Sequence, residues 1–485
     1  MNTRLFPILL ASAALLMAGC TVGPKFVPPV PPQAPAFKEQ PPESFKASQE
    51  WQPARPGDQK IRGAWWEMFG DPQLDALEDQ LTASNQDLKV AEARLRAARA
   101  AIRFNRSGLF PTISTSPSVD NERVSAHQPY FPAFEANNGT GNYSLPFDLS
   151  YEVDLWGRVR RTINASREEA QATAADLATA SLSLHAELAI DYFELRSADA
   201  QKQLLDDTVR AYADALQLTR NRFEGGVAPK SDVAQAQTQL DEARVQDTDI
   251  TEARAEYEHA IATLIGLPPA SFSLPPAPQT PMRLPVIPVG LPSTLLERRP
   301  DIAADERRVA EANEQIGIAR AAYFPALTIG ATGGFEGTTV TNWLNWPSRL
   351  WAVGPQLSET LFDAGRRHAT SEAAQANYDG TVAAYRQTTL NAFQEVEDNL
   401  AALRILEQEA SQQHQATASA QESLQLFTNR YQGGVDNYLQ VITAQTIALA
   451  DERNDIDIQR RRIDASVLLV KAVGGGWDTS QLPRY

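Results

Sequence analysis

Cysteine is nearly absent from this sequence, since Cys20 is the only one among 485 residues. A single cysteine excludes a disulfide scaffold. Histidine is scarce, and its few positions show neither a His-x-x-x-His spacing nor a pairing with glutamate that would indicate a metal site. These positions are His127, His185, His259, His368 and His414. The sequence also has no phosphate-binding loop and no nucleophile elbow, so we expect no catalytic residues, no cofactor and no bound metal.

Long apolar runs and an excess of basic residues are missing as well. After the N-terminal segment no apolar run approaches about 18 residues, so we expect no membrane-spanning helix. The net charge of −16 argues against nucleic acid as a partner. Only four methionines occur, and they form no cluster typical of copper or silver transport.

The N-terminal segment has the parts of a secretory signal. Arg4 precedes an apolar run at 5–17, and small residues then lead to Cys20. We predict that residues 1–19 are a signal peptide and that Cys20 is acylated, with palmitate as one attached chain. The alternative is an ordinary signal that ends at a chance cysteine.

The rest of the chain contains one duplicated unit. The sequence NRFEGGV at 221–227 returns as NRYQGGV at 429–435, an offset of 208 (429 − 221). The same offset relates Gly157 to Gly365 and Gly266 to Gly474, and an offset of 214 relates Phe110 to Phe324. The unit is far longer than a solenoid repeat. We therefore predict two halves of one architecture, each ordered helix, β-hairpin, long helix, helix.

Two proline-rich segments divide the chain, at 21–57 and 267–300, with ten prolines each. Proline favours extended backbone, so the first should wrap or dangle as an arm and the second should join the halves. The predicted organisation is a signal peptide (1–19), a lipidated arm (20–64), a first repeat (65–266) with a hairpin near 111–156, a linker (267–291), a second repeat (292–476) with a hairpin near 325–362, and a C-terminal tail (477–485).

Two stretches predict very long helices. Residues 158–222 contain neither glycine nor proline, and such a helix would be roughly 100 Å long at 1.5 Å per residue. Residues 366–430 repeat the pattern, with Gly380 as a weak point. Shorter helices at 231–264 and 436–472 should return after Gly-Gly turns, which stop helices. Apolar residues recur at coiled-coil spacing in the long stretches, so the helices should pack as hairpins.

Residues 143–155 predict a β-strand that faces lipid. Odd positions are apolar or aromatic and even positions are polar or acidic, which is the pattern of a membrane strand. Further strands are predicted at 350–362, at 327–335 and, more weakly, at 113–119. Three tryptophans suit a belt at the membrane interface: Trp343, Trp346 and Trp351. Four strands cannot close a barrel in lipid, so the chain must assemble.

Three carboxylates lie on the polar face of residues 143–155, namely Asp148, Glu152 and Asp154. In a closed assembly they would line the lumen, and rings of carboxylates favour cations. Alternatively, some of them pair with Arg158 or Arg160 and add little field.

Five motifs resemble the outer-membrane factor family, the TolC-like efflux channels, in its lipoprotein branch. They are WWEMFGDPQL at 65–74, YEVDLWGR at 151–158, ERRPDI at 297–302, GPQLSETLFD at 354–363 and GGVDNYL at 433–439. The likeness covers nearly all of the mature chain. It implies an α+β membrane protein that forms a homotrimer. Each protomer would give four strands to a twelve-stranded β-barrel and its long helical hairpins to a periplasmic α-barrel.

The resemblance implies an outer-membrane exit duct of a tripartite efflux system. Its partners would be a periplasmic adaptor protein and an inner-membrane pump of the RND type. One alternative is a TolC-like duct for type I secretion of proteins or peptides. Another is a lipid-anchored coiled-coil protein, which would explain the helices but not the alternating strand. The exported substrate stays open, because in such a system the pump selects it.

The resemblance assigns adaptor docking to the two Gly-Gly turns. Their residues are Gly225, Gly226, Val227, Gly433, Gly434 and Val435. Small residues there let another backbone approach, although glycines at these positions also end helices.

The resemblance also predicts a periplasmic gate. Asp232 and Tyr431 fall on positions that make closing contacts in the family, and we expect a hydrogen bond between them. Leu439 falls where some members place an apolar ring. Three positions depart from the arginine and two aspartates of TolC, namely Asp436, Gln440 and Thr443, so closure should rest on Leu439 and Asp232. The alternative role of Asp232 is that of an acidic residue favoured in a first helical turn.

Overall fold

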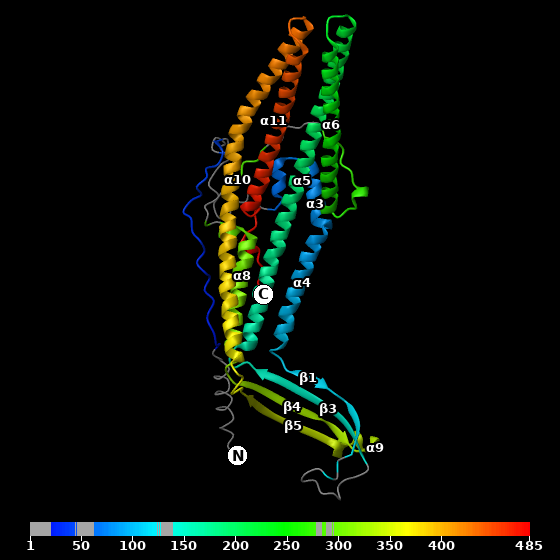
Figure 1. Cartoon of the computed structure of the whole chain (residues 1–485). Coiled ribbons are helices and arrows are strands. Elements are labelled where there is room, and N and C mark those ends of the chain that lie inside the picture. The colour runs from blue at the N-terminus through cyan, green and yellow to red at the C-terminus, as the bar shows by residue number, and fades with distance from the viewer. Residues whose placement is uncertain are drawn as a thin grey trace.

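The chain forms an elongated molecule in which long helices run away from a small β-sheet at one end (Figure 1). This computed structural model describes residues 21–43, 45, 63–123, 125, 127, 139–277, 284–287, 293 and 295–485. Cys20 and the predicted signal peptide lie outside the described residues. Among the described helices, none combines the length and the apolar character needed to cross a membrane.

The elements follow one another in two similar sets. The first set is η2 (Trp65–Phe69), α3 (Pro72–Ser84), α4 (Gln86–Ser107), β1 (Thr112–Thr115), β2 (Ser118–Glu122), β3 (Thr140–Val153), α5 (Arg158–Glu224), α6 (Lys230–Leu264) and η4 (Pro269–Ser271). The second set is α7 (Leu295–Arg298), α8 (Pro300–Ala321), β4 (Ala326–Gly337), α9 (Val340–Trp343), η6 (Trp346–Ser348), β5 (Arg349–Ser358), α10 (Arg366–Gln432), α11 (Tyr438–Ala472) and η7 (Thr479–Gln481). Helices α4, α5 and α6 have the same lengths as α8, α10 and α11, namely 22, 67 and 35 residues. The offsets of 214 and 208 thus relate these helices end to end, and the predicted duplication is confirmed.

Each long helix begins after a glycine in the left-handed region. Gly157 precedes α5 with φ 83° and Gly365 precedes α10 with φ 86°. A residue with a Cβ rarely adopts this conformation, so glycine lets the chain turn sharply from the sheet into the helix. Gly380 does not interrupt α10, and both helices reach roughly 100 Å by their rise per residue.

One antiparallel sheet has the strand order β1–β3–β4–β5, and β2 continues β1 along the same edge of β3. The weak strand predicted at 113–119 is therefore two short strands. Pro117 lies between them and interrupts the ladder, because proline has no N–H to donate. The strand predicted at 350–362 also ends earlier than expected, at Ser358.

Strands β3 and β4 approach each other closely where Pro146 pairs with Gly334. A Cβ on Gly334 would lie 2.2 Å from the carbonyl oxygen of Leu145. Glycine is thus required here, and the Gly-rich run at 330–337 belongs to the sheet.

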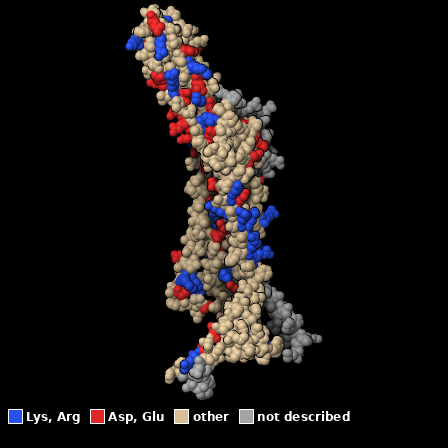
Figure 2. Space-filling view, turned by 90° about the vertical axis from the view of Figure 1, so that its right-hand side faces the viewer, with Lys and Arg blue, Asp and Glu red and all other residues tan. Residues whose placement is uncertain are grey.

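The sheet end of the molecule exposes apolar side chains. Phe147 is 49% exposed, Trp351 76% and Leu357 67%. On the face shown in Figure 2, this end carries few charged atoms, whereas the helices carry both signs of charge. A sheet with these properties is expected to face lipid or other copies of the chain.

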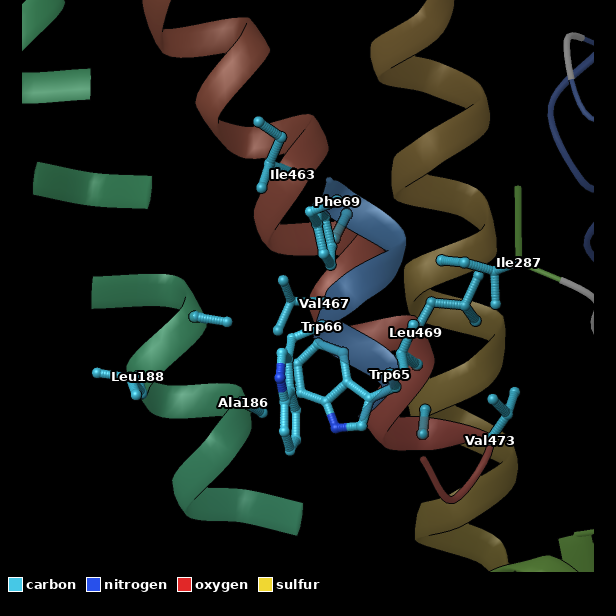
Figure 3. Packing of buried hydrophobic residues seen from close by; sticks show 14 of the residues in the cluster. Trp65, Trp66, Phe69, Ala186, Leu188, Ile287, Ile463, Val467, Leu469 and Val473 are labelled. Atoms are coloured by element: carbon cyan, nitrogen blue, oxygen red, sulfur yellow. The ribbon is translucent and has the colours of Figure 1, made fainter. Parts of the chain in front are cut away.

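The main core lies where the two halves meet, partway along the helices. Figure 3 shows Trp65, Trp66 and Phe69 of η2 packed among α5, α10 and α11. These three side chains belong to the motif at 65–74 and are at most 8% exposed. Asp71 of the same motif accepts hydrogen bonds from two backbone amides at the start of α3, which caps that helix.

Residues 21–43 form an extended arm beside α10, drawn in blue in Figure 1. The backbone amides of Lys38 and Glu39 donate to the two carboxylate oxygens of Glu397, at 2.7 and 2.8 Å. Arg404 forms an ion pair of 2.6 Å with the Glu39 side chain. The described part of the arm therefore wraps along the helices rather than dangling.

Hydrogen bonds join the C-terminal end of α6 to the start of α4, and the C-terminal end of α11 to the start of α8. Asn85 Nδ2 donates to the carbonyl oxygen of Leu264 at 2.8 Å, and Arg299 Nη1 donates to that of Ala472 at 3.1 Å. Asn85 corresponds to Arg299 at the offset of 214, and Leu264 corresponds to Ala472 at the offset of 208. The two halves therefore make the same contact with different side chains. Arg299 forms further ion pairs with two carboxylates, those of Asp301 and Glu395.

Candidate functional site

The end of the molecule far from the sheet consists of two turns, one on each helical hairpin (Figure 1). In the first turn the amide of Val227 donates to the carbonyl of Arg222, and in the second the amide of Val435 donates to the carbonyl of Arg430, both at 2.9 Å. Gly226 and Gly434 have φ of 76° and 74°. The turns thus have the same backbone geometry, which allows a direct comparison of their side chains.

The predicted docking residues are largely open to solvent. Val227 is 68% exposed and Val435 is 67% exposed. The four glycines add little bulk, and a Cβ on Gly226 would meet no atom within 4 Å. The glycines and valines therefore leave a small, accessible apolar surface at each turn, and exposed charged residues such as Glu224 and Lys230 lie beside it.

The two arginines that precede the turns have different partners. Arg430 forms a forked ion pair with Asp436, at 2.6 and 3.1 Å. The hydrogen bonds from Arg430 hold the pKa of the Asp436 carboxyl below its usual value. Arg222 instead crosses to the other hairpin, where its Nη1 donates to the carbonyl oxygens of Tyr431 and Gln432 at 3.0 and 3.2 Å.

The expected hydrogen bond between Asp232 and Tyr431 is not formed within the described chain. The hydroxyl of Tyr431 is buried and has no hydrogen-bond partner among the described residues. Its ring packs against Tyr438, with centroids 5.1 Å apart, and lies under the Arg222 guanidinium. Asp232 lies in the first turn of α6 and accepts from Ser231 Oγ at 3.4 Å. Its observed position matches the alternative role, in which the helix dipole favours an acidic residue.

The third predicted gate residue, Leu439, lies in the first turn of α11, and Gln440 and Thr443, which depart from the family pattern, lie close to it in the sequence. Leu439 is 52% exposed and is free to meet a neighbouring surface. The Thr443 hydroxyl donates to the carbonyl of Leu439 at 2.9 Å. Gln440 is exposed. These residues leave Leu439 as an apolar candidate for a constriction.

Tyr431 and Tyr438 belong to a small cluster that joins the two hairpins near the tips. The cluster also contains Tyr212, Leu216 and Val441. Burial raises the pKa of Tyr438 to about 12, so its hydroxyl stays neutral. The hairpins are thus held together by aromatic packing and by Arg222, both inside one chain.

The three carboxylates of the polar strand face have different partners. Asp148 accepts a hydrogen bond of 2.6 Å from Thr332. Glu152 is ion-paired with Arg158 at 2.5 Å, and Asp154 with Arg160 at 3.1 Å. The pairing alternative therefore holds for two of the three, and Asp148 is the one without a basic partner among the described residues.

One polar pair lies inside the main core. Glu78 Oε2 lies 2.6 Å from His185 Nδ1, and the two side chains are 0% and 6% exposed. Burial raises the pKa of Glu78 to about 9 and lowers that of His185 to about 4. Trp66 stacks on the imidazole at 4.3 Å. The pair is therefore a neutral carboxyl and a neutral imidazole that share a hydrogen bond.

Among the described residues, no group of three or more histidine, cysteine or acidic side chains could hold a metal ion. Sequence reasoning missed Arg222 and the pair of Glu78 and His185. The duplication held a signal for Arg222. Its counterpart Arg430 has an aspartate six residues later, Asp436, whereas the residue six positions after Arg222 is Ala228. No sequence pattern brings Glu78 next to His185.

Comparisons with known proteins agree with this architecture. The model of the outer membrane efflux protein family matches residues 77–267 and 291–475. The chain is 31% identical to the toluene efflux pump outer membrane protein TtgC of Pseudomonas putida, over 96% of this chain and 95% of that protein. It is also 31% identical to the outer membrane protein OprJ of Pseudomonas aeruginosa, over 96% and 95% of the two chains. The solved structure of the outer-membrane channel OprN matches with a TM-score of 0.85 and 29% identity, over 94% of this chain and all of that one.

Proposed function

The chain belongs to the outer membrane efflux protein family, and we infer from this that it is the outer-membrane exit duct of a tripartite efflux system. Its elongated shape supports this function, because the helices extend about 100 Å from the sheet. A duct of this length would reach from the outer membrane toward an adaptor and an inner-membrane pump. The duct works passively and has no chemical step of its own.

We propose that the working unit is a homotrimer. Support comes from a comparison of corresponding helices in the two halves. Helix α8 packs on both long helices, α5 and α10, and buries 12 of its 22 residues. Its counterpart α4 packs on α5 and buries only Leu88, Leu95 and Ile102. The missing partner of α4 would be α10 of another copy.

Helix α10 shows the matching open surface. None of its residues from 366 to 384 is buried, whereas α5 buries seven between 158 and 176. On α4, Val90 is 49% exposed, while its counterpart Ala304 on α8 is fully buried. One neighbouring copy would cover both surfaces.

The same assembly would complete the sheet. Both edges, β1 with β2 on one side and β5 on the other, have no partner strand among the described residues. Lipid does not tolerate unpaired strand edges, so edges of neighbouring copies should pair. Three copies, the number that the family resemblance implies, would give a twelve-stranded barrel.

We propose in addition that Cys20 is acylated. The amide of Val22 donates to the carbonyl of Trp156 at 3.1 Å, next to the junction of β3 and α5. The start of the described arm thus lies beside the ends of the strands. A lipid on the neighbouring residue in the sequence would reach the membrane there, as a second anchor beside the barrel.

At the other end, we propose that the exposed Gly-Gly turns dock an adaptor and that Leu439 narrows the resting duct. Support comes from the exposure of Val227 and Val435 and from the 52% exposed Leu439. An apolar ring of three leucines would repel water and ions.

Chemical cross-linking tests the trimer. The ion pair of Arg308 with Asp176 joins α8 to α5, and its counterparts on α4 and α10 are Arg94 and Ala384. We expect a bismaleimide to link Arg94→Cys with Ala384→Cys between copies, giving bands of two and three chains. The matched control, Arg308→Cys with Asp176→Cys, should link within one chain. Larger bands, or no bands while the control pair reacts, would contradict the trimer.

A further inference from the structure

Helix α9 lies against the apolar face of the sheet, at the end farthest from the long helices (Figure 1). Trp343 of α9 packs on Tyr143 of β3, with ring centroids 5.7 Å apart. Tyr143 belongs to the odd-numbered, apolar side of that strand. Its partner on β4, Gly337, makes room for the helix, because a Cβ there would lie 2.9 Å from the Cα of Trp343. The connection between β4 and β5 therefore folds over the face that is expected to meet lipid.

This connection is held in shape by its own hydrogen bonds and exposes apolar side chains. A capping box starts α9, and Ser348 Oγ donates to the carbonyl of Asn342 at 2.5 Å. Val340 and Leu344 are 66% and 62% exposed. Their spacing from Trp343 places all three on the same side of the helical turn. A ligand of this surface would not have to order the connection first, which lowers the free-energy cost of binding.

Arg349 adds a positive charge beside these apolar side chains. It is exposed, and it pairs with Phe335 on the apolar side of the sheet. Its guanidinium lies 4.4 Å from the ring centroid of Trp346, and its Nη1 donates to the carbonyl oxygen of Trp346 at 2.8 Å. Arg349 has no ion pair and no other hydrogen bond with the described residues. Most of its five N–H donors are thus available to a ligand.

The position along the strands places this surface near one boundary of the membrane. Ten residues separate Tyr143 from Val153, which is roughly 33 Å along β3 at 3.3 Å per residue. At the usual tilt of membrane strands this is about 25 Å of depth, the height of the apolar band of a barrel. The long helices start just after Val153, so Tyr143 and Arg349 lie near the opposite, outer boundary.

We propose that Val340, Leu344, Trp346 and Arg349 bind a phosphate-bearing lipid of the outer leaflet. This inference rests on the proposed function, which places the sheet in the outer membrane. A guanidinium can donate two parallel hydrogen bonds to a phosphate group. The acyl chains of the same lipid would cover the exposed valine and leucine, and this contact favours a lipid over a free phosphate ion.

Native mass spectrometry of the detergent-solubilised protein tests the site, with phosphorylated and dephosphorylated lipid A as the probes. Arg349→Ala should weaken binding of the phosphorylated form about 10-fold, the size of effect expected for hydrogen bonds to a charged group. It should bind the dephosphorylated form like the parent, which also shows that the variant is folded. Arg349→Lys keeps the charge without the forked donors and should fall between the two. Leu344→Ser should weaken binding of both forms about 5-fold, because it removes apolar contact area.

Two matched controls lie near the other end of the molecule. Arg220→Ala removes an equal charge, and Leu426→Ser makes the same change on a leucine that is 55% exposed. Both should bind lipid A like the parent. Equal losses in Arg220→Ala and Arg349→Ala would reveal a general attraction to charge and overturn the site. If inorganic phosphate displaced lipid A at the concentration of the lipid itself, the site would be one for free phosphate and the lipid proposal would be wrong.

Ion conduction through planar bilayers, recorded with the same preparations, separates this proposal from the exit duct. A protein that conducts but binds phosphorylated lipid A equally with and without Arg349 would overturn the lipid site and leave the duct in place. A protein that shows the Arg349-dependent binding but never conducts would overturn the duct and leave a membrane-facing sheet with its lipid site.

Discussion

Replacing Glu78 with glutamine should make the protein more stable at neutral and basic pH. Glu78 is fully buried, and its carboxyl hydrogen-bonds to the imidazole of His185. Burial, together with the charges of Asp75 and Asp79, raises the pKa of Glu78 from 4.5 to about 9. Glutamine keeps a hydrogen-bond donor toward His185 and needs no added proton, so it removes the free-energy cost of keeping a buried carboxyl protonated above pH 4.5.

The direction of the change in stability with pH follows from the linkage between proton binding and folding. The pKa of Glu78 is higher in the folded state, so its stabilising contribution is complete below about pH 4.5 and is lost as the pH rises toward 9. The parent should therefore lose on the order of 1 kcal/mol per pH unit relative to Glu78→Gln across this range. His185 has a lowered pKa, which makes its contribution fall below pH 6.5, but it is present in both proteins and cancels in the comparison.

The assay is urea unfolding in detergent, followed by circular dichroism at pH 5, 6, 7 and 8. Glu92→Gln is the matched control, since it makes the same change on an exposed residue whose charge does not act on Glu78. If the free energy of unfolding changed with pH in the same way for the parent and for Glu78→Gln, the conclusion that the Glu78 carboxyl stays protonated in the core would be wrong.

Five further substitutions have defined outcomes. Arg299→Ala should cost about 2 kcal/mol in urea unfolding, because it removes a buried side chain that hydrogen-bonds to two carboxylates and to the carbonyl of Ala472. Asn85→Ala should cost about 1 kcal/mol as a lost cap, and equal costs would argue against a contribution from the ion pairs of Arg299. Cys20→Ser should abolish labelling with radioactive palmitate, and label that persists would place the acyl chain elsewhere. Gly434→Trp should stop efflux while cross-linked trimers still form, whereas normal drug resistance would count against docking at the tips. Asp148→Asn should reduce cation preference in reversal potentials, and an unchanged preference would mean that the strand carboxylates do not set it.

The sequence was a good guide to the helices because their ends carry clear signals. Glycine marks both ends of α5 and α10, and the predicted limits of 158–222 and 366–430 fall two residues short of the observed ends. The strands were harder. Proline at 117 splits the first one, and alternation on its own does not show where pairing stops.

Contacts made by extended or backbone groups were out of reach of sequence reasoning. The arm has no periodicity that predicts its hydrogen bonds to Glu397. Arg222 binds backbone carbonyls 209 and 210 residues away, which any residue type would offer. The resemblance to a family placed Asp232 and Tyr431 at the same end of the molecule, but it could not show that the tyrosine ring turns toward Arg222.

In the proposed assembly, three copies of the chain enclose one continuous duct. Single-particle imaging of the full-length, lipid-embedded protein tests it most directly. We expect three chains around one axis, with α4 of each chain packed on α10 of the next and an open path from the strands to the Gly-Gly turns. An assembly with another number of chains, or three chains packed around a solid centre, would contradict the exit duct described here.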